Sequence, residues 1–321
     1  MKITTRQLAL CAVLTALALG LSTLENLFPV TLVIPLPGVK LGLANIVTVF
    51  ALYQLGPLPA LCILAARCLL GALVGGSLTA LAFSLTGGLL ALGTMALLLR
   101  CGRFSLFGVS IAGAAAHNTG QILAAMEVLG LAGMDFAIVD TEHAPCDQML
   151  LLDLLRAADS VGLPTIVRVP EGTEPYILKA LDLGASGVQI PGLSTVEEID
   201  RAISFTKYAP RGVRGLSFAQ RSAGYGTKEK FRYMQDSNEG LINVVHIENK
   251  DAAAHTEELC RREDIDVLFI GPMDISQSLG HPGDPAHPEV QQVVRQVIDT
   301  CNANEKPFGI FVGTTEAARE Y

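Results

Sequence analysis

Four segments in the second half of the chain end an apolar run with residues that can carry charge or bind a metal ion. The first ends at Asp140, with His143 shortly after it, and the second ends at Arg168. The third ends at Glu248, and the fourth is followed by Asp274. In a barrel of alternating strands and helices, catalytic groups come from the carboxyl ends of several strands. The repeated pattern therefore predicts one site built from these strand ends.

The two carboxylates Glu248 and Asp274 offer hard oxygen ligands from neighbouring strands. Such ligands, with other positions open to water, suit Mg²⁺ or Mn²⁺, with Co²⁺ as an alternative. A 2-oxo acid can chelate such an ion through its carboxylate and keto oxygens. The ion then acts as a Lewis acid and stabilises the enolate formed when a carbon–carbon bond breaks.

Two basic residues complete the predicted chemistry. Arg168 can stabilise the same developing negative charge. His143 suits a general base at neutral pH. A neighbouring carboxylate, either Asp140 or Asp182, would fix the tautomer of this histidine and raise its basicity. We take Asp140, His143, Arg168 and Asp182 as the candidate catalytic residues.

Each of these residues, taken alone, has a simpler structural explanation. An aspartate at position 274 would cap the next helix, Arg168 would form a surface ion pair, and His143 would be a loop histidine. Their joint placement at successive strand ends favours the catalytic interpretation.

Strand-like runs alternate with amphipathic segments after about residue 127, which predicts a parallel sheet with helices outside. The expected strands are Phe136–Asp140, Thr165–Arg168, Gly187–Pro191, Ile242–Glu248, Val267–Gly271 and Phe308–Val312. The expected helices are Gln148–Ser160, Pro175–Leu183, Thr195–Tyr208, Ala252–Arg262 and Pro288–Ala303. Because a closed TIM-type (β/α)₈ barrel needs eight strands, the pattern predicts an incomplete barrel.

The first 126 residues have a different composition. Their charged residues are six basic and one acidic: Lys2, Arg6, Lys40, Arg67, Arg100, Arg103 and Glu25. The whole chain has a net charge of −8, so the second part is strongly acidic. We therefore expect two domains, residues 1–126 and 127–321, and no nucleic-acid partner, because such binding needs basic patches. The seven scattered cysteines contain no CxxC pair and predict neither a zinc site nor a disulfide framework.

Five apolar runs in the first part are transmembrane candidates, and we expect a bundle of four to five spans. They are Gln7–Leu24, Leu41–Leu55, Pro57–Val74, Ser77–Leu99 and Phe104–Met126. The proline-rich stretch Phe28–Lys40 predicts a re-entrant or interfacial connector. Within the runs, Arg67, His117 and Asn118 would either contact a substrate or hold helices together.

The second part resembles the HpcH/HpaI aldolase family from about Glu127 to Tyr321. The segments that carry the resemblance are LGLAGMDFAIVDTEHAP, PTIVRVP, ALDLGASGVQIP, VHIENKDA, DVLFIGPMDISQSLG and KPFGIFVG. The resemblance implies that the chain cleaves 4-hydroxy-2-oxo acids to pyruvate, or a relative, and an aldehyde, and that this half forms a homo-oligomer. It also implies that His143 is the base, that Asp182 raises its basicity, and that Glu248 and Asp274 bind the metal.

Two departures from the family pattern concern the substrate. His246 and Met273 stand where many members have Gln and Ala. With Arg168 and Asp274 they form the expected substrate-binding set. The glycine-rich stretch Gly212–Gly226 resembles the substrate-side loop of the family, with Arg214 and Arg221.

Residues 1–125 resemble the Gx transporter family, also known as heptaprenyl diphosphate synthase component I. The resemblance rests on PGVKLGLANIVTVFALYQLGP, GGSLTALAFSLTGGLLALGTMALL and GVSIAGAAAHNTGQ. We interpret the chain as a fusion of two partial domains, joined near Ala124–Glu127. The alternative function is a membrane transporter subunit for a small molecule or lipid precursor, with an inert soluble tail.

The predicted spans and the resemblance of residues 1–125 predict a multi-pass protein of a bacterial-type cell membrane. Basic residues near the amino terminus favour an inside location for that end. Four spans would then keep the aldolase half in the cytoplasm, and five would place it outside.

Overall fold

A computed structural model describes residues 4–27, 43–75, 78–312 and 319, so the predicted connector Phe28–Lys40 lies outside the described residues. The chain divides into two compact units, Met1–Ala132 and Gly133–Tyr321. The change of composition at residues 126 and 127 lies inside helix α5 (Leu106–Leu131). The two units divide after α5 ends, rather than at the change of composition, because α5 is one continuous helix across that change.

Five helices occur among the described residues of the first unit, and each matches one of the predicted apolar runs. They are α1 (Thr5–Leu27), α2 (Leu43–Leu55), α3 (Pro57–Gly75), α4 (Leu78–Cys101) and α5. Small residues let two of them approach closely, since a Cβ atom on Gly120 of α5 would lie 3.0 Å from the Cα of Gly87 in α4.

Two stretches of described helix are long and apolar enough to cross a membrane, Thr5–Leu24 and Ser84–Cys101. The apolar stretches Ala44–Leu55 and Pro57–Leu73 are shorter. The expectation of four to five spans therefore stays a prediction. Large apolar side chains are nevertheless exposed on all five helices, among them Leu8, Val13, Ile46, Leu73, Leu97, Phe107 and Ile111.

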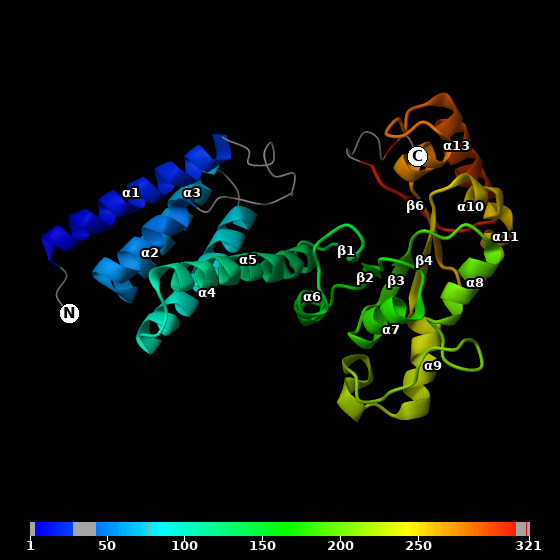
Figure 1. Ribbon diagram of the computed structural model, residues 1–321, viewed down its shortest axis with the longest axis horizontal. Coiled ribbons are helices and arrows are strands. Elements are labelled where there is room, and N and C mark those ends of the chain that lie inside the picture. The colour runs from blue at the N-terminus through cyan, green and yellow to red at the C-terminus, as the bar shows by residue number, and fades with distance from the viewer. Residues whose placement is uncertain (1–3, 28–42, 76–77, 313–318, 320–321) are drawn as a thin grey trace. The chain divides into compact units, whose positions relative to one another are not determined.

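Six parallel strands form the sheet in the described part of the second unit, in the order β1-β2-β3-β4-β5-β6. They are β1 (Ala137–Asp140), β2 (Thr165–Arg168), β3 (Gly187–Ile190), β4 (Ile242–Ile247), β5 (Val267–Ile270) and β6 (Phe308–Ile310). All six predicted strands are confirmed, with ends within two residues. Figure 1 shows them side by side. The sheet is open, as part of a TIM-like barrel, and β1 and β6 are its edges among the described strands.

Helices connect successive strands and cover one face of the sheet. They are α6 (Gln148–Ser160), α7 (Glu174–Asp182), α8 (Val196–Ser204), α9 (Lys230–Gly240), α10 (Lys250–Ala254), α11 (Thr256–Cys260), α12 (Pro272–Ser278) and α13 (Pro288–Ala303), with a short 3₁₀ segment η2 (Arg221–Gly226). The predicted helix Ala252–Arg262 is in fact two short helices that meet at His255.

The register of the sheet decides which side chains share a face. Asp140 pairs with Arg168, and Arg168 pairs with Gln189. Because side chains alternate along a strand, these three polar residues lie on one face of the sheet. Their neighbours Val167 and Val188, which point to the other face, are fully buried. The polar set therefore occupies the face that would line the interior of a complete barrel.

Candidate active site at the carboxyl ends of the strands

Arg168, at the end of β2, is held by two carboxylates from the end of β1. Its Nε donates to Asp140 Oδ1 at 2.9 Å, and its Nη2 donates to Asp140 Oδ2. Its Nη1 lies 3.2 Å from Glu142 Oε2. Burial acts to raise the pKa of Asp140, but hydrogen bonds from Arg168 and from the backbone of Glu142 and His143 outweigh it and lower that pKa. Asp140 is therefore a carboxylate that orients the guanidinium.

His143 is exposed and lies beside Glu142. Its Nε2 is 3.7 Å from Glu142 Oε2, whereas Asp140 accepts a hydrogen bond from its backbone N–H at 3.3 Å. The carboxylate next to the imidazole is therefore Glu142, which the sequence analysis did not assign. Burial raises the pKa of Glu142, and the charge of Glu248 adds to this, against the opposing effect of Arg168 and His143.

Glu248 follows β4 and is held on both of its oxygens. His246 Nδ1 lies 2.7 Å from Oε2, and the backbone N–H of Gly192 donates to Oε1. The other ring nitrogen of His246 contacts Gln189 Nε2. Burial acts to raise the pKa of Glu248, but the contacts with His246 and Gly192 and the charge of Arg168 lower it overall. A charged carboxylate with fixed orientation results.

Gly271 lies between the two predicted metal ligands. A Cβ atom at this position would be 3.0 Å from Glu248 Cβ and 3.5 Å from Asp274 Oδ2. Asp274, in the first turn of α12, is exposed, and so is Met273 beside it. The residues fit a divalent cation, because Glu248 and Asp274 both lie beside the space that the glycine leaves. Each oxygen of Glu248 accepts one hydrogen bond and has a second lone pair.

Asp182 is not placed as predicted. It ends α7, and its Oδ1 accepts a hydrogen bond from Arg214 Nη2 at 3.1 Å. No contact between Asp182 and His143 occurs among the described residues. Burial raises the pKa of Asp182, and Arg214 opposes this rise. The last residue of a helix that leads into a parallel strand lies at the amino end of the sheet, away from the strand ends that carry His143.

The glycine-rich stretch also lies at the amino end of the sheet, which corrects its assignment to the substrate side. Arg221 donates to the carbonyl of Leu183, which follows α7, and contacts Asp159 near the end of α6. Arg214 and Arg221 line a polar pocket of about 550 Å³ there. Both arginines therefore interact with helix carboxyl termini rather than with the candidate active site.

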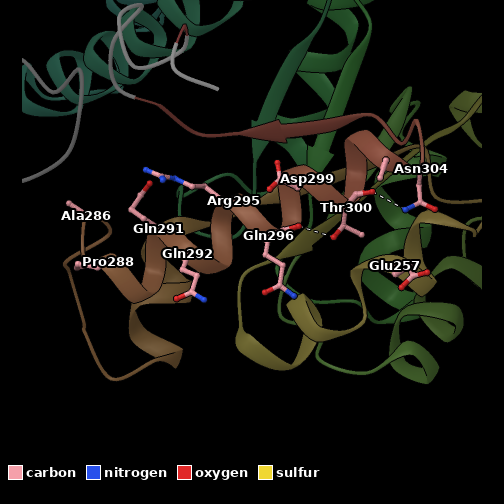
Figure 2. A pocket seen from close by; sticks show the side chains of 11 residues that line it. Glu257, Ala286, Pro288, Gln291, Gln292, Arg295, Gln296, Asp299, Thr300 and Asn304 are labelled. Carbon is pink, nitrogen blue, oxygen red and sulfur yellow. Dashed lines mark hydrogen bonds between the residues drawn. The ribbon is translucent and has the colours of Figure 1, made fainter.

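Another pocket, of about 960 Å³, lies along α13 and is shown in Figure 2. Most of its lining residues have polar side chains, among them Gln292, Arg295, Gln296 and Asp299. None of the predicted site residues lines it. The volume of this pocket alone would therefore suggest a site along α13 rather than at the strand ends, where the ionisable groups lie.

Sequence reasoning missed Glu142, Gln189, Gly192 and Gly271. Glu142 had a signal, because it follows a strand within the same acidic segment as Asp140. Gln189 had one too, as a single polar residue in the apolar strand β3. Gly192 acts through its backbone, and Gly271 acts by the space it leaves. The residue type gave no indication of either role.

Two family models match the chain, which bears out both resemblances. Residues 14–138 match heptaprenyl diphosphate synthase component I, and residues 118–321 match HpcH/HpaI aldolase/citrate lyase. The second match covers more than half of the chain.

Curated relatives of the second part are aldolases. One is the 2-dehydro-3,6-dideoxy-6-sulfogluconate aldolase of Pseudomonas putida, 37% identical over 195 residues, which are 61% of this chain and 76% of that protein. Another is the 5-keto-4-deoxy-D-glucarate aldolase of Salmonella newport (strain SL254), 36% identical over 61% of this chain and 75% of that protein.

Comparison with solved structures supports the same family and a similar fold. An HpcH/HpaI aldolase/citrate lyase family protein from Burkholderia cenocepacia J2315 superimposes with a TM-score of 0.58 at 33% identity, covering 62% of this chain and 79% of that one. The citrate synthase SbnG gives a TM-score of 0.55 at 27% identity, covering 62% and 76%. With its strand-end carboxylates, its arginine and its histidine, the chain belongs to the HpcH/HpaI aldolase/citrate lyase family.

Proposed function

We propose that this chain is a divalent-metal-dependent aldolase that cleaves 4-hydroxy-2-oxo acids to pyruvate, or a close relative, and an aldehyde. The observation that carries the proposal is that Glu248 and Asp274 both lie beside Gly271. The contacts of Glu248 with His246 and Gly192 and the charge of Arg168 lower the pKa of Glu248, which favours its charged form. The relatives named as aldolases of keto-deoxy sugar acids support the same reaction class.

Glu248 and Asp274 would hold the metal ion, with Mg²⁺ or Mn²⁺ preferred by the all-oxygen donor set and Co²⁺ as a substitute. When bound, such an ion supplies a Lewis acid for the 2-oxo group of the substrate. The contacts of His246 and Gly192 with Glu248 keep its carboxylate charged and oriented.

The chain's own residues account for the proton and the developing charge. A base takes the proton of the substrate 4-hydroxyl group, the carbonyl of the aldehyde forms, and the bond between C3 and C4 breaks. We assign the base to His143, whose exposed ring lies beside Glu142. Arg168, held by Asp140, donates to the oxygen on which negative charge develops. The proton then returns to C3 of the product.

The substrate side of the proposal rests on His246, Met273 and Arg168. Met273 is exposed beside Asp274, where a thioether would contact the apolar part of a substrate. His246 is buried and reaches the substrate through its contact with Glu248. The family resemblance also supports the proposal that Asp182 raises the basicity of His143, although the contact of Asp182 in the structure is with Arg214.

A direct test is release of a 2-oxo acid from 4-hydroxy-2-oxo acids by the full-length chain. The purified protein is stripped with a chelator and assayed with Mg²⁺, Mn²⁺ or Co²⁺. Activity is expected to require the ion and to be lost in Glu248→Ala and Asp274→Ala. Glu197→Ala, on the exposed first turn of α8, is the matched control. Metal-independent cleavage, or full activity in both site variants, would contradict the proposal.

We also propose that residues 1–126 form a Gx-transporter-like membrane domain of four to five spans. Two helices that are long and apolar enough to cross a membrane support this, and so do the apolar side chains exposed on α1–α5. The match to heptaprenyl diphosphate synthase component I supports the second candidate function, a transporter subunit for a small molecule or lipid precursor. Uptake that requires residues 1–126 and survives Glu248→Ala would favour transport. A reporter fused after Tyr321 tests whether the aldolase half faces the cytoplasm.

Self-association of the aldolase half is a further part of the proposal. Met134, Phe136 and Ile138 are exposed at and just before the edge strand β1. Exposed apolar side chains along a sheet edge favour contact with another chain. Light scattering of the purified protein would report a homo-oligomer, and a monomer at all concentrations would contradict this part.

A further inference from the structure

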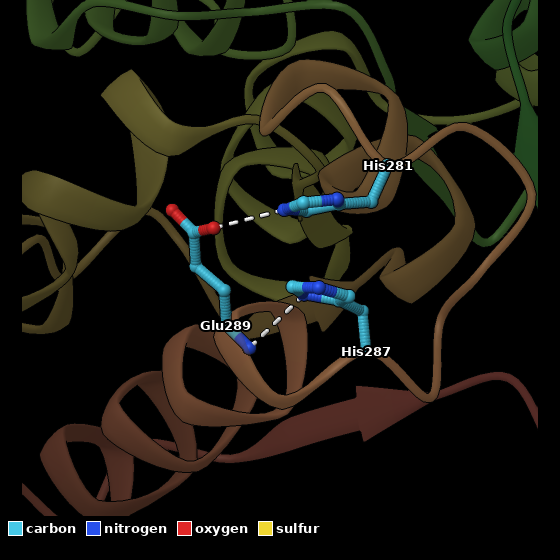
Figure 3. Close-up of side chains that lie close together, drawn as sticks. All are labelled: His281, His287 and Glu289. Atoms are coloured by element: carbon cyan, nitrogen blue, oxygen red, sulfur yellow. Dashed lines mark hydrogen bonds and ion pairs between the residues drawn. The ribbon is translucent and has the colours of Figure 1, made fainter.

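Three side chains that could ligate a metal ion lie together between the end of α12 and the first turn of α13. They are His281, His287 and Glu289, and their ligand atoms lie within 4.8 Å of one another. Figure 3 shows the two imidazole rings stacked and the glutamate beside them. The ring centroids are 3.5 Å apart with an interplanar angle of 19°. His281 Nε2 lies 2.9 Å from Glu289 Oε2.

Local backbone structure fixes this segment. The backbone N–H of His281 donates to the carbonyl of Ser276 at 2.8 Å, and that of Gly283 donates to Ser276 Oγ at 3.2 Å. Gly280 and Gly283 adopt φ of 83° and 80°, which glycine does without strain. Pro288 follows His287 at the first position of α13. A buried serine and two turns thus hold His281 near the start of α13.

We propose that His281, His287 and Glu289 form a second metal site, selective for a borderline ion such as Zn²⁺. Two imidazole nitrogens and one carboxylate oxygen are a donor set that binds Zn²⁺, with a fourth position left to water. The cluster is partly exposed, so that position is open to solvent. The proposal is independent of the aldolase function, because none of these residues lies among the strand-end groups.

One distance in the cluster is close to that of a tetrahedral zinc site, and all three ligand atoms lie within 4.8 Å of one another. With bonds of about 2.0–2.2 Å, ligand atoms in such a site are roughly 3.4 Å apart. The pair His281 Nε2 and Glu289 Oε2 is already slightly closer than this, at 2.9 Å. A cation would replace the proton that these two atoms share. Side-chain rotation alone can adjust the third ligand.

His287 must turn for the site to close. Its Nδ1 accepts a hydrogen bond from the backbone N–H of Glu289 at 3.3 Å, which is long for such a bond. Nitrogen lone pairs lie in the plane of the imidazole, so two parallel rings cannot both point at one ion. Metal binding would therefore turn the two rings out of their parallel arrangement. His287 would lose its long hydrogen bond from the backbone of Glu289 and gain a bond to the metal ion. Without a metal ion, His281 pairs with the carboxylate of Glu289, and His287 caps α13.

The chemistry of the two sites separates them. Glu248 and Asp274 offer only oxygen atoms, which suit Mg²⁺ and Mn²⁺, whereas imidazole suits Zn²⁺, Co²⁺ and Ni²⁺. The two sites are also linked along the chain, because Asp274 lies in α12 and His281 follows shortly after that helix ends. A bound Zn²⁺ would tie the end of α12 to the start of α13 (Pro288–Ala303).

The test measures metal binding rather than turnover. The full-length protein is stripped of metal and titrated with Co²⁺ in excess Mg²⁺, with visible absorption as the signal, and Zn²⁺ is then used to displace the Co²⁺. One equivalent is expected per chain. Binding should weaken at least tenfold in His281→Gln and in Glu289→Gln, and should be unchanged in His255→Gln, a matched histidine control outside the cluster.

Two further variants keep the outcomes distinct. Asp274→Ala removes a ligand of the proposed Mg²⁺ site, and its Co²⁺ and Zn²⁺ binding is expected to match the parent chain. Zn²⁺ is also expected to raise the melting temperature of the parent chain but not that of His281→Gln, with circular dichroism confirming that both fold. Equal Zn²⁺ affinity in the parent chain and both cluster variants, or loss of Zn²⁺ binding in Asp274→Ala alone, would overturn the second site.

Discussion

Arg168 binds Asp140 through two of its nitrogen atoms, across the first pair of strands in the sheet. Two nitrogen atoms of the guanidinium match the two oxygens of the carboxylate. These two parallel hydrogen bonds fix the plane of the guanidinium as well as its position. The third nitrogen faces Glu142. The orientation of Arg168 is therefore set before any substrate arrives.

Arg168→Lys tests the importance of that orientation. Lysine keeps the charge but cannot make the two parallel hydrogen bonds. We expect kcat/KM for the cleavage reaction to fall by about 10²–10³-fold, the loss seen when a donor to a developing oxyanion is removed. Steady-state kinetics on protein with an unchanged circular dichroism spectrum checks this. Activity equal to that of the parent chain would show that charge alone suffices.

Asp140→Asn tests a dependence on pH. The folded-state pKa of Asp140 is lowered, so its stabilising effect is present above the unfolded pKa of about 3.9 and is lost as pH falls through the folded value. The parent chain should therefore lose stability below about pH 4 more steeply than the variant. Thermal melts of both proteins between pH 3 and 7 make the comparison. Parallel curves over this range would count against the prediction.

Gly271→Ala tests the space between the proposed metal ligands. The backbone of Gly271 has φ −106°, which alanine adopts without strain, so only the contacts with Glu248 and Asp274 oppose the new methyl group. We expect Mn²⁺ affinity to fall by about tenfold or more, as when the surroundings of a metal ligand are disturbed. Isothermal titration measures it. Gly240→Ala, where the added carbon meets nothing within 4 Å, is the control.

His246 can be changed in two ways that separate its roles. Leucine would remove both polar contacts and leave Glu248 without its side-chain partner, so metal affinity should fall about 10–100-fold. Glutamine can still donate to a carboxylate, so His246→Gln should keep the metal and change the preference among aldehydes instead. Competition assays with paired substrates test the second effect. Identical behaviour of the two variants would contradict this division.

Asp182→Asn distinguishes the observed contact from the role that the family resemblance implies. Arg214 is nearly fully buried, so loss of the paired charge should destabilise the fold by roughly 3 kcal/mol. If the contact with Arg214 is its main role, turnover per folded molecule stays unchanged. A large fall in turnover at unchanged stability would instead favour a role beside His143. Chemical denaturation and kinetics on the same preparation decide between them.

The sheet could be predicted because its strands carry a strong local signal. Thr165–Arg168 is an apolar run with a charged end. The helix Gln148–Ser160 begins after a capping aspartate, and the helix Pro288–Ala303 begins with a proline. By contrast, α9 (Lys230–Gly240) was missed because its sequence is mostly polar, and only Tyr233 and Asn238 in it are buried. No apolar stripe marked it as a helix.

The candidate site was predicted in its residue types but less well in its pairings. Glu248 and Asp274 both lie beside Gly271, because the carboxyl ends of parallel strands meet at one edge, and their role as metal ligands stays a prediction. The pairing of Asp182 with Arg214 joins positions 32 residues apart and depends on how a loop packs under the sheet. Composition and spacing contain no information on such a contact. The same applies to Gly192, whose role belongs to its backbone.

The order of the strands has a consequence for how the protein behaves in a cell. Strands β1 and β6 each have one neighbour among the described strands, so a row of backbone N–H and C=O groups on each faces no strand partner there. Such rows are templates that bind extended segments of other proteins. High expression should therefore lead to precipitation or capture by chaperones sooner than for a closed barrel, and a proline placed in β6 should delay it.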